Sequence, residues 1–186
     1  MPPVRNIFAC RSYLLRLARD RDGVSAVEFA VVLPFMLTLY LGGIELGDGL
    51  AIQFRSTLAA RTVADLASQY VSIDNAAMSS ILGAASTVVT PYSAANMVVT
   101  VSEVTTNSHG QATVVWSDSL NGTARTVGSS VTLPTKLQQA NITLIFGEVT
   151  YPYTPSMGYV ITGTISIYES MYFFPRMSTT VTRVNS

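Results

Sequence analysis

Glu28 is the residue whose chemistry most needs an explanation. It is the only charged residue in the run 24–44, which is otherwise uncharged and mostly apolar. A carboxylate in such surroundings is costly unless it meets a cation or lies near the positive end of a helix dipole. The pattern therefore predicts either a cationic partner for Glu28 or a place at the helix start, in the lipid headgroup layer. Two acids beyond the run, Glu45 and Asp48, are expected to be ordinary interfacial acids rather than ligands.

Catalytic and metal-binding motifs are missing from the sequence. There is one histidine, His109, in the turn-like segment "TTNSHGQA", and one cysteine, Cys10. The HExxH motif, paired cysteines and the phosphate-binding GxxxxGK[ST] loop do not occur. We therefore expect a protein that is not an enzyme and uses no metal or other cofactor. The acids scattered over residues 74–169 leave open a hydrolytic carboxylate pair assembled by the fold.

Residues 24–44 predict a membrane-spanning helix. At about 1.5 Å rise per residue the run makes about 32 Å of helix, enough to cross a hydrocarbon core of about 30 Å. A buried helix of a soluble protein is the alternative, but few elements of a 186-residue chain could surround it. Pro34 removes the usual hydrogen bond to the carbonyl of Ala30, so a kink is expected there.

The segment before this run is basic. Residues 1–22 contain five arginines and two aspartates, whereas the rest of the chain has more acids than bases. This asymmetry predicts a cytoplasmic N-terminus and a C-terminal part on the far side of the membrane. A nucleic-acid partner is not expected, because the remainder of the chain has no basic stripe.

The helix is expected to continue beyond the membrane. Residues 51–70 contain no proline or glycine, and Arg61 and Asp65 are spaced to pair at i, i+4. An apolar stripe at helical spacing is formed by Ile52, Ala59, Val63, Leu66 and Tyr70. The junction before it is weakened by Gly42, Gly43, Gly47 and Gly49. These glycines predict either a bend or close helix packing.

The remaining residues predict a small antiparallel β domain. A short helix capped by Asp74 or Asn75 comes first. Runs rich in Val, Thr, Ile and Tyr follow, separated by turn residues, and predict strands at 97–105, 111–117, 141–153, 159–174 and 177–184. We expect four or five strands packed on the outer half of the long helix. The alternation in "VVTVSEVT" predicts that one face of its strand meets water.

Together these elements predict an α+β fold, in which a long N-terminal transmembrane helix continues into a small antiparallel β-sheet domain. Four parts are expected along the chain. They are a cationic leader (1–23), a transmembrane helix (24–44), a helix extension (45–72) and a β-rich domain (73–186).

The order of residues 23–29 resembles the prepilin processing signature. Gly23 is separated by four residues from the pair Glu28 and Phe29, after a basic leader and before the span. With "GVSAVEFAVVLPFMLTLYLGGIELG" and, at 148–176, "EVTYPYTPSMGY…PR", the chain is similar to TadE-like minor pilins or pseudopilins of the Flp (tight adherence) pilus systems. The resemblance covers the first 70 residues and the last 40, and it implies a pilin-like fold.

This resemblance implies that a prepilin peptidase cleaves after Gly23 and leaves Val24 as the new N-terminus. Glycine suits such a cut because it passes easily through an extended peptidase site. The resemblance further implies that Glu28, beside Phe29, pairs with the new α-amine of a neighbouring subunit, and a free α-amine has a pKa of about 8. Such a pair would set the axial register, because a slip leaves two charges unpaired. Other pilin-like families have Phe where Val24 stands, so methylation of the amine stays open.

We therefore expect a structural minor pilin or pseudopilin that acts in assembly of a Flp-type adhesion pilus. Its expected partners are the prepilin peptidase, other pilins or pseudopilins, the inner-membrane assembly platform and the lipid bilayer. The expected location is the bacterial inner membrane, single-pass, with the C-terminal domain periplasmic, or the extracellular pilus after assembly. Two alternatives are an uncleaved membrane-anchored assembly scaffold and a membrane-tethered periplasmic hydrolase.

Overall fold

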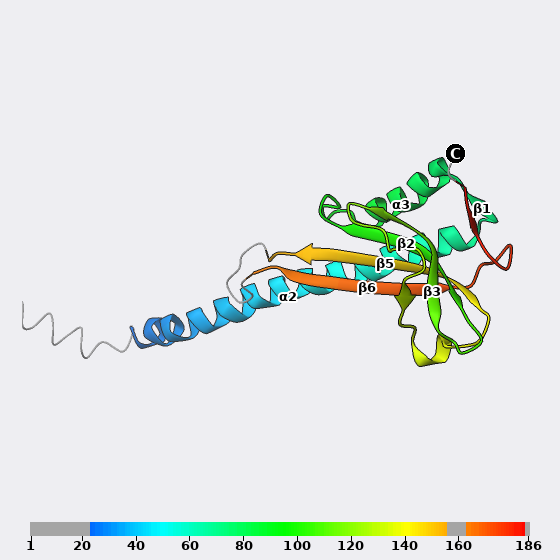
Figure 1. Ribbon diagram of the computed structural model, residues 1–186. Helices are drawn as coiled ribbons and strands as arrows, with labels where there is room; N and C mark the ends of the chain where they lie inside the picture. The colour runs from blue at the N-terminus through cyan, green and yellow to red at the C-terminus, as the bar shows by residue number, and fades with distance from the viewer. Residues whose placement is uncertain (1–22, 156–162, 185–186) are drawn as a thin grey trace, which may run out of the picture. The chain divides into compact units, whose positions relative to one another are not determined.

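The structure is a computed structural model that describes residues 23–155 and 163–184. The predicted leader, except Gly23, lies outside the described residues, and so does the start of the predicted strand 159–174. Along the chain, one long helix is followed by a shorter helix and then by the strands of the main sheet (Figure 1). Contacts within the chain divide it into two compact units, Met1–Ile44 and Glu45–Ser186.

Helix α2, Val24–Ser68, contains the predicted span and most of the predicted extension. It begins directly after Gly23, whose carbonyl oxygen accepts the N–H of Val27 at 3.1 Å. The four glycines of the junction are all helical, and the predicted bend or close helix packing there stays a prediction. Residues on both sides of Pro34 are helical as well, and the hydroxyl of Thr38 donates to the Pro34 carbonyl at 2.8 Å. The kink at Pro34 stays a prediction.

Helix α2 ends at Ser68, four residues before the predicted end of the extension at residue 72. A 3-10 type turn follows, because the N–H of Gln69 donates to the carbonyl oxygen of Leu66, three residues earlier, at 3.1 Å. The carbonyl oxygen of Ser68 accepts the N–H of Arg176 at 2.8 Å. A distant segment therefore satisfies a carbonyl that the helix end leaves without an intrahelical partner.

Five strands form one antiparallel sheet in the order β4-β3-β2-β5-β6, and four of them overlap predicted strands, whereas the short β4 was not predicted. Their bounds are β2 Val98–Thr106, β3 Ala112–Leu120, β4 Ser130–Val131, β5 Thr143–Tyr153 and β6 Ile165–Phe173. A short 3-10 helix, η1 Thr135–Leu137, lies between β4 and β5. The prediction of four or five antiparallel strands packed against the long helix is confirmed.

The predicted strand 177–184 is mostly wrong. Only β7, Thr182–Arg183, is a strand within it, and its partner is β1, Ser72–Ile73. This pairing is parallel and forms a separate two-stranded sheet. A parallel partner so far away in the chain leaves no hairpin signal in the sequence.

Helix α3, Asn75–Val89, is the predicted short helix. The carboxylate of Asp74 accepts the N–H of Ala77 at 2.7 Å and caps its N-terminus. Of the two predicted caps, Asp74 is therefore the one used.

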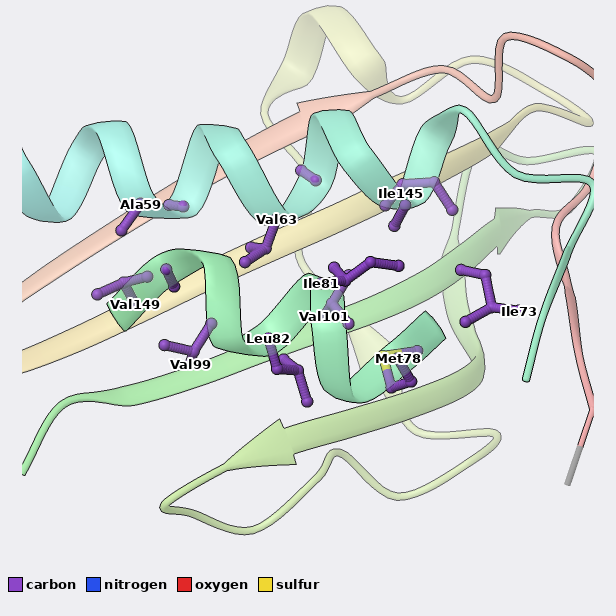
Figure 2. Close-up of a cluster of buried hydrophobic side chains, with 14 of the residues drawn as sticks. Ala59, Val63, Ile73, Met78, Ile81, Leu82, Val99, Val101, Ile145 and Val149 are labelled. Atoms are coloured by element: carbon purple, nitrogen blue, oxygen red, sulfur yellow. The ribbon is translucent and has the colours of Figure 1, made fainter. Parts of the chain in front are cut away.

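The main core lies between one face of the sheet and the two helices, and Figure 2 shows side chains of α2, α3, β2 and β5 meeting there. Helix α2 contributes mostly small side chains, namely Ala59, Ala60, Val63, Ala64 and Ala67. The predicted stripe is thus right at Ile52, Ala59 and Val63, but Tyr70 is 38% exposed. The sequence stripe emphasised large residues, whereas close packing on the sheet selects small ones.

The prediction of a wet face on β2 is wrong. Alternate residues of this strand face opposite sides of the sheet, yet both Val101 and Ser102 are completely buried. Strand β2 is central, and a second core cluster covers its other face, with Val131 and Leu133 of the β3–β5 connection packed near Phe146. The polar residues of β2 are satisfied within the protein, since the Ser102 hydroxyl donates to Ser117 Oγ at 2.8 Å.

Candidate functional site

The Gly23–Val24 peptide bond lies at the start of α2. Gly23 is in a turn, and no atom lies within 4 Å of the position that a Cβ on Gly23 would occupy. Val24 is the first helical residue and is also exposed. On the described side of this bond, an extended substrate requires that the first helical turn opens, which is closed by the hydrogen bond from the Val27 N–H to the Gly23 carbonyl. The geometry is thus compatible with cleavage at this bond.

Glu28 and Phe29 follow on the same helix, and both residues are exposed. Glu28 lies four residues after Val24, which corresponds to about 6 Å along the helix. None of the ion pairs found among the described residues includes Glu28. The predicted pairing of Glu28 with the α-amine of a neighbouring subunit stays a prediction.

The large apolar side chains of residues 24–44 are exposed almost throughout. The most exposed are Val27, Phe29, Phe35, Leu39 and Tyr40. Of the helices in the described part of the chain, α2 is the one long and apolar enough to cross a membrane, and none of its most apolar stretch is buried within the protein. Exposed apolar surface of this extent requires lipid or another protein around it, so the helix points to membrane anchoring.

Glu45 differs from its prediction. It is 2% exposed and so is not an ordinary interfacial acid, whereas Asp48, one turn later, is half-buried. The Tyr153 hydroxyl at the end of β5 donates to the Glu45 backbone carbonyl at 3.1 Å. Burial raises the pKa of Tyr153, and the nearby charges of Asp48 and Glu45 add to this rise. The phenol therefore stays protonated and keeps its donor.

Arg176 belongs to the Pro-Arg pair at the end of the segment 148–176, and it contacts the C-terminal end of α2. Its guanidinium forms an ion pair with Asp65 and lies over the Phe173 ring, 5.8 Å from the centroid. The predicted i, i+4 pair of Arg61 with Asp65 is therefore wrong, because Asp65 pairs with Arg176 instead. The i, i+4 spacing of Arg61 and Asp65 is a local signal, and it carries no information on Arg176, which is 111 residues away from Asp65 in the chain.

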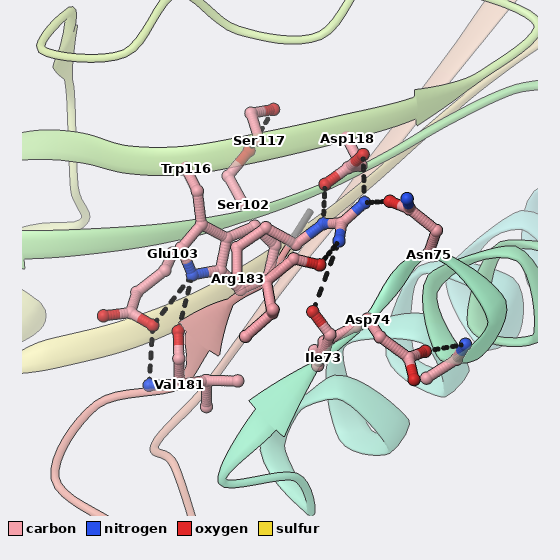
Figure 3. Close-up of polar contacts among 12 residues, drawn as sticks. Ile73, Asp74, Asn75, Ser102, Glu103, Trp116, Ser117, Asp118, Val181 and Arg183 are labelled. Carbon is pink, nitrogen blue, oxygen red and sulfur yellow. Dashed lines mark hydrogen bonds and ion pairs between the residues drawn. The ribbon is translucent and has the colours of Figure 1, made fainter. Parts of the chain in front are cut away.

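A buried polar network holds the C-terminal segment against the sheet (Figure 3). The indole N–H of Trp116 donates to the Val181 carbonyl at 2.7 Å and to Glu103 Oε2 at 3.1 Å. The same carboxylate oxygen accepts the N–H of Val181 at 2.8 Å. Burial raises the pKa of Glu103, although these two hydrogen bonds lower it in part. Arg183 completes the network through an ion pair with Asp118 at 2.8 Å.

The second buried glutamate of the sheet, Glu148, lies on the other face from Glu103. Its two carboxylate oxygens accept hydrogen bonds from Arg125, each at 2.6 Å, and one of them also accepts the Tyr168 hydroxyl at 2.7 Å. Burial, followed by this hydrogen bond, raises the pKa of Tyr168 to about 12. Glu148 pairs with Thr100 of β2, three residues from Glu103, so the two glutamates face opposite sides. They cannot act together on one substrate.

Neither network was predicted from the sequence. Glu103 appeared there as a residue of an alternating strand, and Glu148 as a residue of the predicted strand 141–153 and the first residue of the segment 148–176. The sequence signal that could have indicated these networks is a carboxylate inside a run of strongly β-forming residues. The described residues contain no group of three or more His, Cys, Asp or Glu residues placed to hold a metal ion.

The comparisons with known proteins agree with the sequence resemblance. Residues 23–65 match the model of the family described as TadE-like protein, so the resemblance is confirmed over this stretch. The match begins at Gly23 and extends to Asp65, while the segment 148–176 lies outside it. No curated protein and no solved structure matches the chain.

Proposed function

We propose, from the TadE-like match over residues 23–65, that this protein is a minor pilin or pseudopilin of a Flp-type (tight adherence) pilus. One observation carries the proposal: the match starts at Gly23, directly before an apolar helix that is exposed along its most apolar stretch. The role is structural rather than catalytic. The helix anchors the protein in the membrane and offers its surface to other subunits.

Processing after Gly23 is the first step of this proposal. A membrane prepilin peptidase cuts the Gly23–Val24 bond and removes the basic leader with its five arginines. The cut frees an α-amine at the N-terminus of α2. Losing the positive charges also removes the attraction that holds the segment at an anionic cytoplasmic surface.

Glu28 then provides the contact between subunits. Its carboxylate is exposed and takes part in none of the ion pairs found among the described residues. The free amine of a neighbouring subunit neutralises it in an apolar bundle, where an unpaired carboxylate would be costly. Phe29 and the other exposed apolar residues supply the packing surface around this pair.

The proposed location is the bacterial inner membrane, with the N-terminus cytoplasmic and the folded β domain periplasmic. The basic residues before the span support this orientation. Assembly into the extracellular pilus is compatible with the same geometry. Other pilins and the inner-membrane assembly platform are the proposed partners.

An uncleaved assembly scaffold is the main alternative, since it would use the same anchor without processing. A periplasmic hydrolase is a weaker alternative, because the two buried glutamates of the sheet face opposite sides and both accept hydrogen bonds. The residue at the N-terminus of the protein from native cells distinguishes the first alternative from the proposal.

The decisive experiment compares Gly23→Ala with the wild type in host cells that contain the peptidase. We expect wild-type protein to begin at Val24 and Gly23→Ala protein to retain its leader, as measured by mass spectrometry of the N-terminus. Gly43→Ala is the matched control, because a Cβ at either glycine meets no atom within 4 Å. Equal amounts of mature product from both glycine variants, or a wild-type protein that begins at Met1, would contradict the proposal.

A further inference from the structure

A small cleft of about 200 Å³ lies on the face of the sheet that points away from α2. Gly147 and Val149 of β5 face α2 and the main core, so Glu148 and Thr150, which alternate with them, face the opposite side. Strands β2, β5 and β6 line the cleft together with the segment between β3 and β4. Its lining includes Thr100, Thr123, Arg125, Glu148, Thr150 and Tyr168. Neither the proposed processing nor the proposed subunit register uses these residues.

Three of the lining side chains are held together by short hydrogen bonds. Arg125 donates from Nε to Glu148 Oε2 and from Nη2 to Glu148 Oε1, each at 2.6 Å. The Tyr168 hydroxyl donates to the same Oε1 at 2.7 Å. The guanidinium also lies over the Phe146 ring, 5.3 Å from the centroid, and the backbone N–H of Arg125 donates to Ser117 Oγ at 3.0 Å. The polar wall of the cleft is therefore formed before any ligand binds, which lowers the cost of binding.

This wall keeps both donors and acceptors for a ligand. The bonds to Glu148 come from Nε and Nη2 of Arg125, and Nη1 donates to no group of the described residues. Glu148 Oε2 accepts one hydrogen bond within the described part of the chain, and a carboxylate oxygen can accept a second. Thr123 and Thr150 add hydroxyl groups to the lining. A ligand that fits this lining has several groups that each donate and accept, as hydroxyl groups do.

The cleft has no net charge. Arg125 and Glu148 neutralise each other, and the other lining residues are uncharged. Tyr168 is neutral as well, because burial and then its hydrogen bond to Glu148 raise its pKa to about 12. The lining therefore favours neither an anion nor a cation, and the ligand is a neutral one.

The size of the cleft and the exposed Tyr168 ring restrict the ligand further. Cavities for drug-sized ligands have about 300–1,000 Å³, so a cleft of about 200 Å³ holds roughly one small ring. Tyr168 is 53% exposed, although its hydroxyl is fixed. The negative face of an aromatic ring attracts the C–H groups of a sugar ring. An extended peptide instead binds along a sheet edge or a long groove, whereas this cleft lies on a sheet face.

We propose that this cleft binds one neutral hexopyranose residue of a glycan, linked through its C1 atom. Arg125 donates to one sugar hydroxyl, and Glu148 accepts a hydrogen bond from a neighbouring one. Thr123 and Thr150 bind further hydroxyl groups, and the C–H face of the sugar ring lies against Tyr168. The inference goes beyond the proposed pilus function and depends only on the folded β domain. Cleavage after Gly23 is not required for it.

The test measures the binding of methyl glycosides of glucose, galactose and mannose by saturation-transfer difference NMR. The full chain is held in lipid nanodiscs, because the sugar headgroups of maltoside and glucoside detergents would compete, and empty nanodiscs give the background. We expect the wild type to bind at least one glycoside with a Kd of about 1–10 mM, as a few neutral contacts allow.

Variants then locate the binding in the cleft. Thr150→Val removes one hydroxyl without changing the shape of the side chain and should weaken binding roughly three- to tenfold. Tyr168→Leu removes the ring and should weaken it by about tenfold or more. Thr143→Val is the matched control, because Thr143 is half-buried on the same strand, outside the lining, and should leave the Kd unchanged. Unfolding followed by the fluorescence of Trp116 checks that each variant is folded.

Several results would overturn the inference. One is a wild type that binds no glycoside up to about 100 mM, and another is equal weakening by Thr150→Val and Thr143→Val. Glucosamine or glucuronate binding more than about tenfold tighter than the neutral glycosides would show a preference for charge. Free sugars that bind tighter than their methyl glycosides by the same factor would exclude a linked residue, and a neutral tetrapeptide that displaces the glycoside would make the ligand a peptide. Absence of cleavage at Gly23 would contradict the proposed function and leave this inference unaffected.

Discussion

Gly147 of β5 lies so close to Ala60 of α2 that a Cβ on Gly147 would come within 2.5 Å of the Ala60 carbonyl oxygen. The same Cβ would lie 2.9 Å from the Cβ of Ala64. Helix and sheet therefore touch through their backbones at this point. This contact explains why the buried face of α2 consists mainly of alanine rather than of larger apolar residues.

Gly147→Ala should therefore destabilise the folded domain. The backbone of Ala60 cannot move as a flexible side chain can, so α2 must shift away from the sheet. Overpacking of this kind costs about 1–3 kcal/mol in the free energy of unfolding. Urea unfolding of the full chain in detergent, followed by the fluorescence of Trp116, the single tryptophan, measures this loss.

Gly83→Ala is the matched control for this prediction. Gly83 lies inside α3, and a Cβ there would meet no atom within 4 Å. Alanine is the better helix former, so this variant should be as stable as the wild type or more stable. If Gly147→Ala and Gly83→Ala unfolded at the same urea concentration, the close contact of Gly147 with Ala60 would not limit the free energy of unfolding, and the prediction would be wrong.

The features that the sequence predicted well are those with a local pattern. The apolar run, the start of the helix after Gly23 and the cap at Asp74 all depend on residues within a few positions. The strands 97–105 and 141–153 were predicted within two residues of β2 and β5, because β-branched runs bounded by turn residues are local as well. The family match over residues 23–65 begins at an equally local signature, while the roles of Gly23 and Glu28 stay predictions.

The features that the sequence did not predict depend on distant partners. Asp65 pairs with Arg176 rather than with Arg61, and β7 pairs in parallel with β1. Whether the polar face of β2 meets water depends on the path of the β3–β5 connection, which no residue of β2 encodes. Such contacts follow from the tertiary arrangement, so a single sequence carries little information on them.

Glu103→Gln should change how stability depends on pH. Burial raises the pKa of Glu103 above its ordinary value of 4.5, so the folded state holds this proton more tightly than the unfolded chain does. The stabilisation is complete below about pH 4.5 and is lost as the pH rises through the folded-state pKa. Glutamine is neutral throughout, so the variant should lack this loss. Urea unfolding at a series of pH values from about 4 to about 8 would show the difference.

The control for this prediction is Glu169→Gln, which neutralises a half-buried acid of β6. It should keep the wild-type loss of stability above about pH 4.5. Parallel pH profiles for the wild type and Glu103→Gln would show that Glu103 is not the group responsible. The hydrogen bonds from Trp116 and Val181 would then outweigh the burial of the carboxylate.

Two arginines should differ in their importance for stability. Arg125 binds both oxygens of Glu148, whose side chain is only 9% exposed, whereas Arg176 and Asp65 are 52% and 32% exposed. Arg125→Ala leaves a nearly buried carboxylate without its cation and should cost about 1–3 kcal/mol. Arg176→Ala should cost less than about 1 kcal/mol from its ion pair, because solvent screens an exposed pair. Unfolding in urea compares the two, and an equal or larger loss for Arg176→Ala would refute the ranking.

Glu28→Gln should separate processing from assembly. The substitution leaves Gly23 and the start of α2 unchanged, so the mature protein should still begin at Val24. The amine of a neighbouring subunit would then have no carboxylate to neutralise it in the apolar bundle, and incorporation should fall roughly tenfold or more. Quantifying the protein in sheared pili and in cross-linked membrane complexes measures this fall, with mass spectrometry of the N-terminus as the check on processing. Glu28→Asp, which keeps the charge on a shorter side chain, should retain part of the incorporation. Wild-type amounts of Glu28→Gln protein in assembled complexes would show that the register does not depend on this charge.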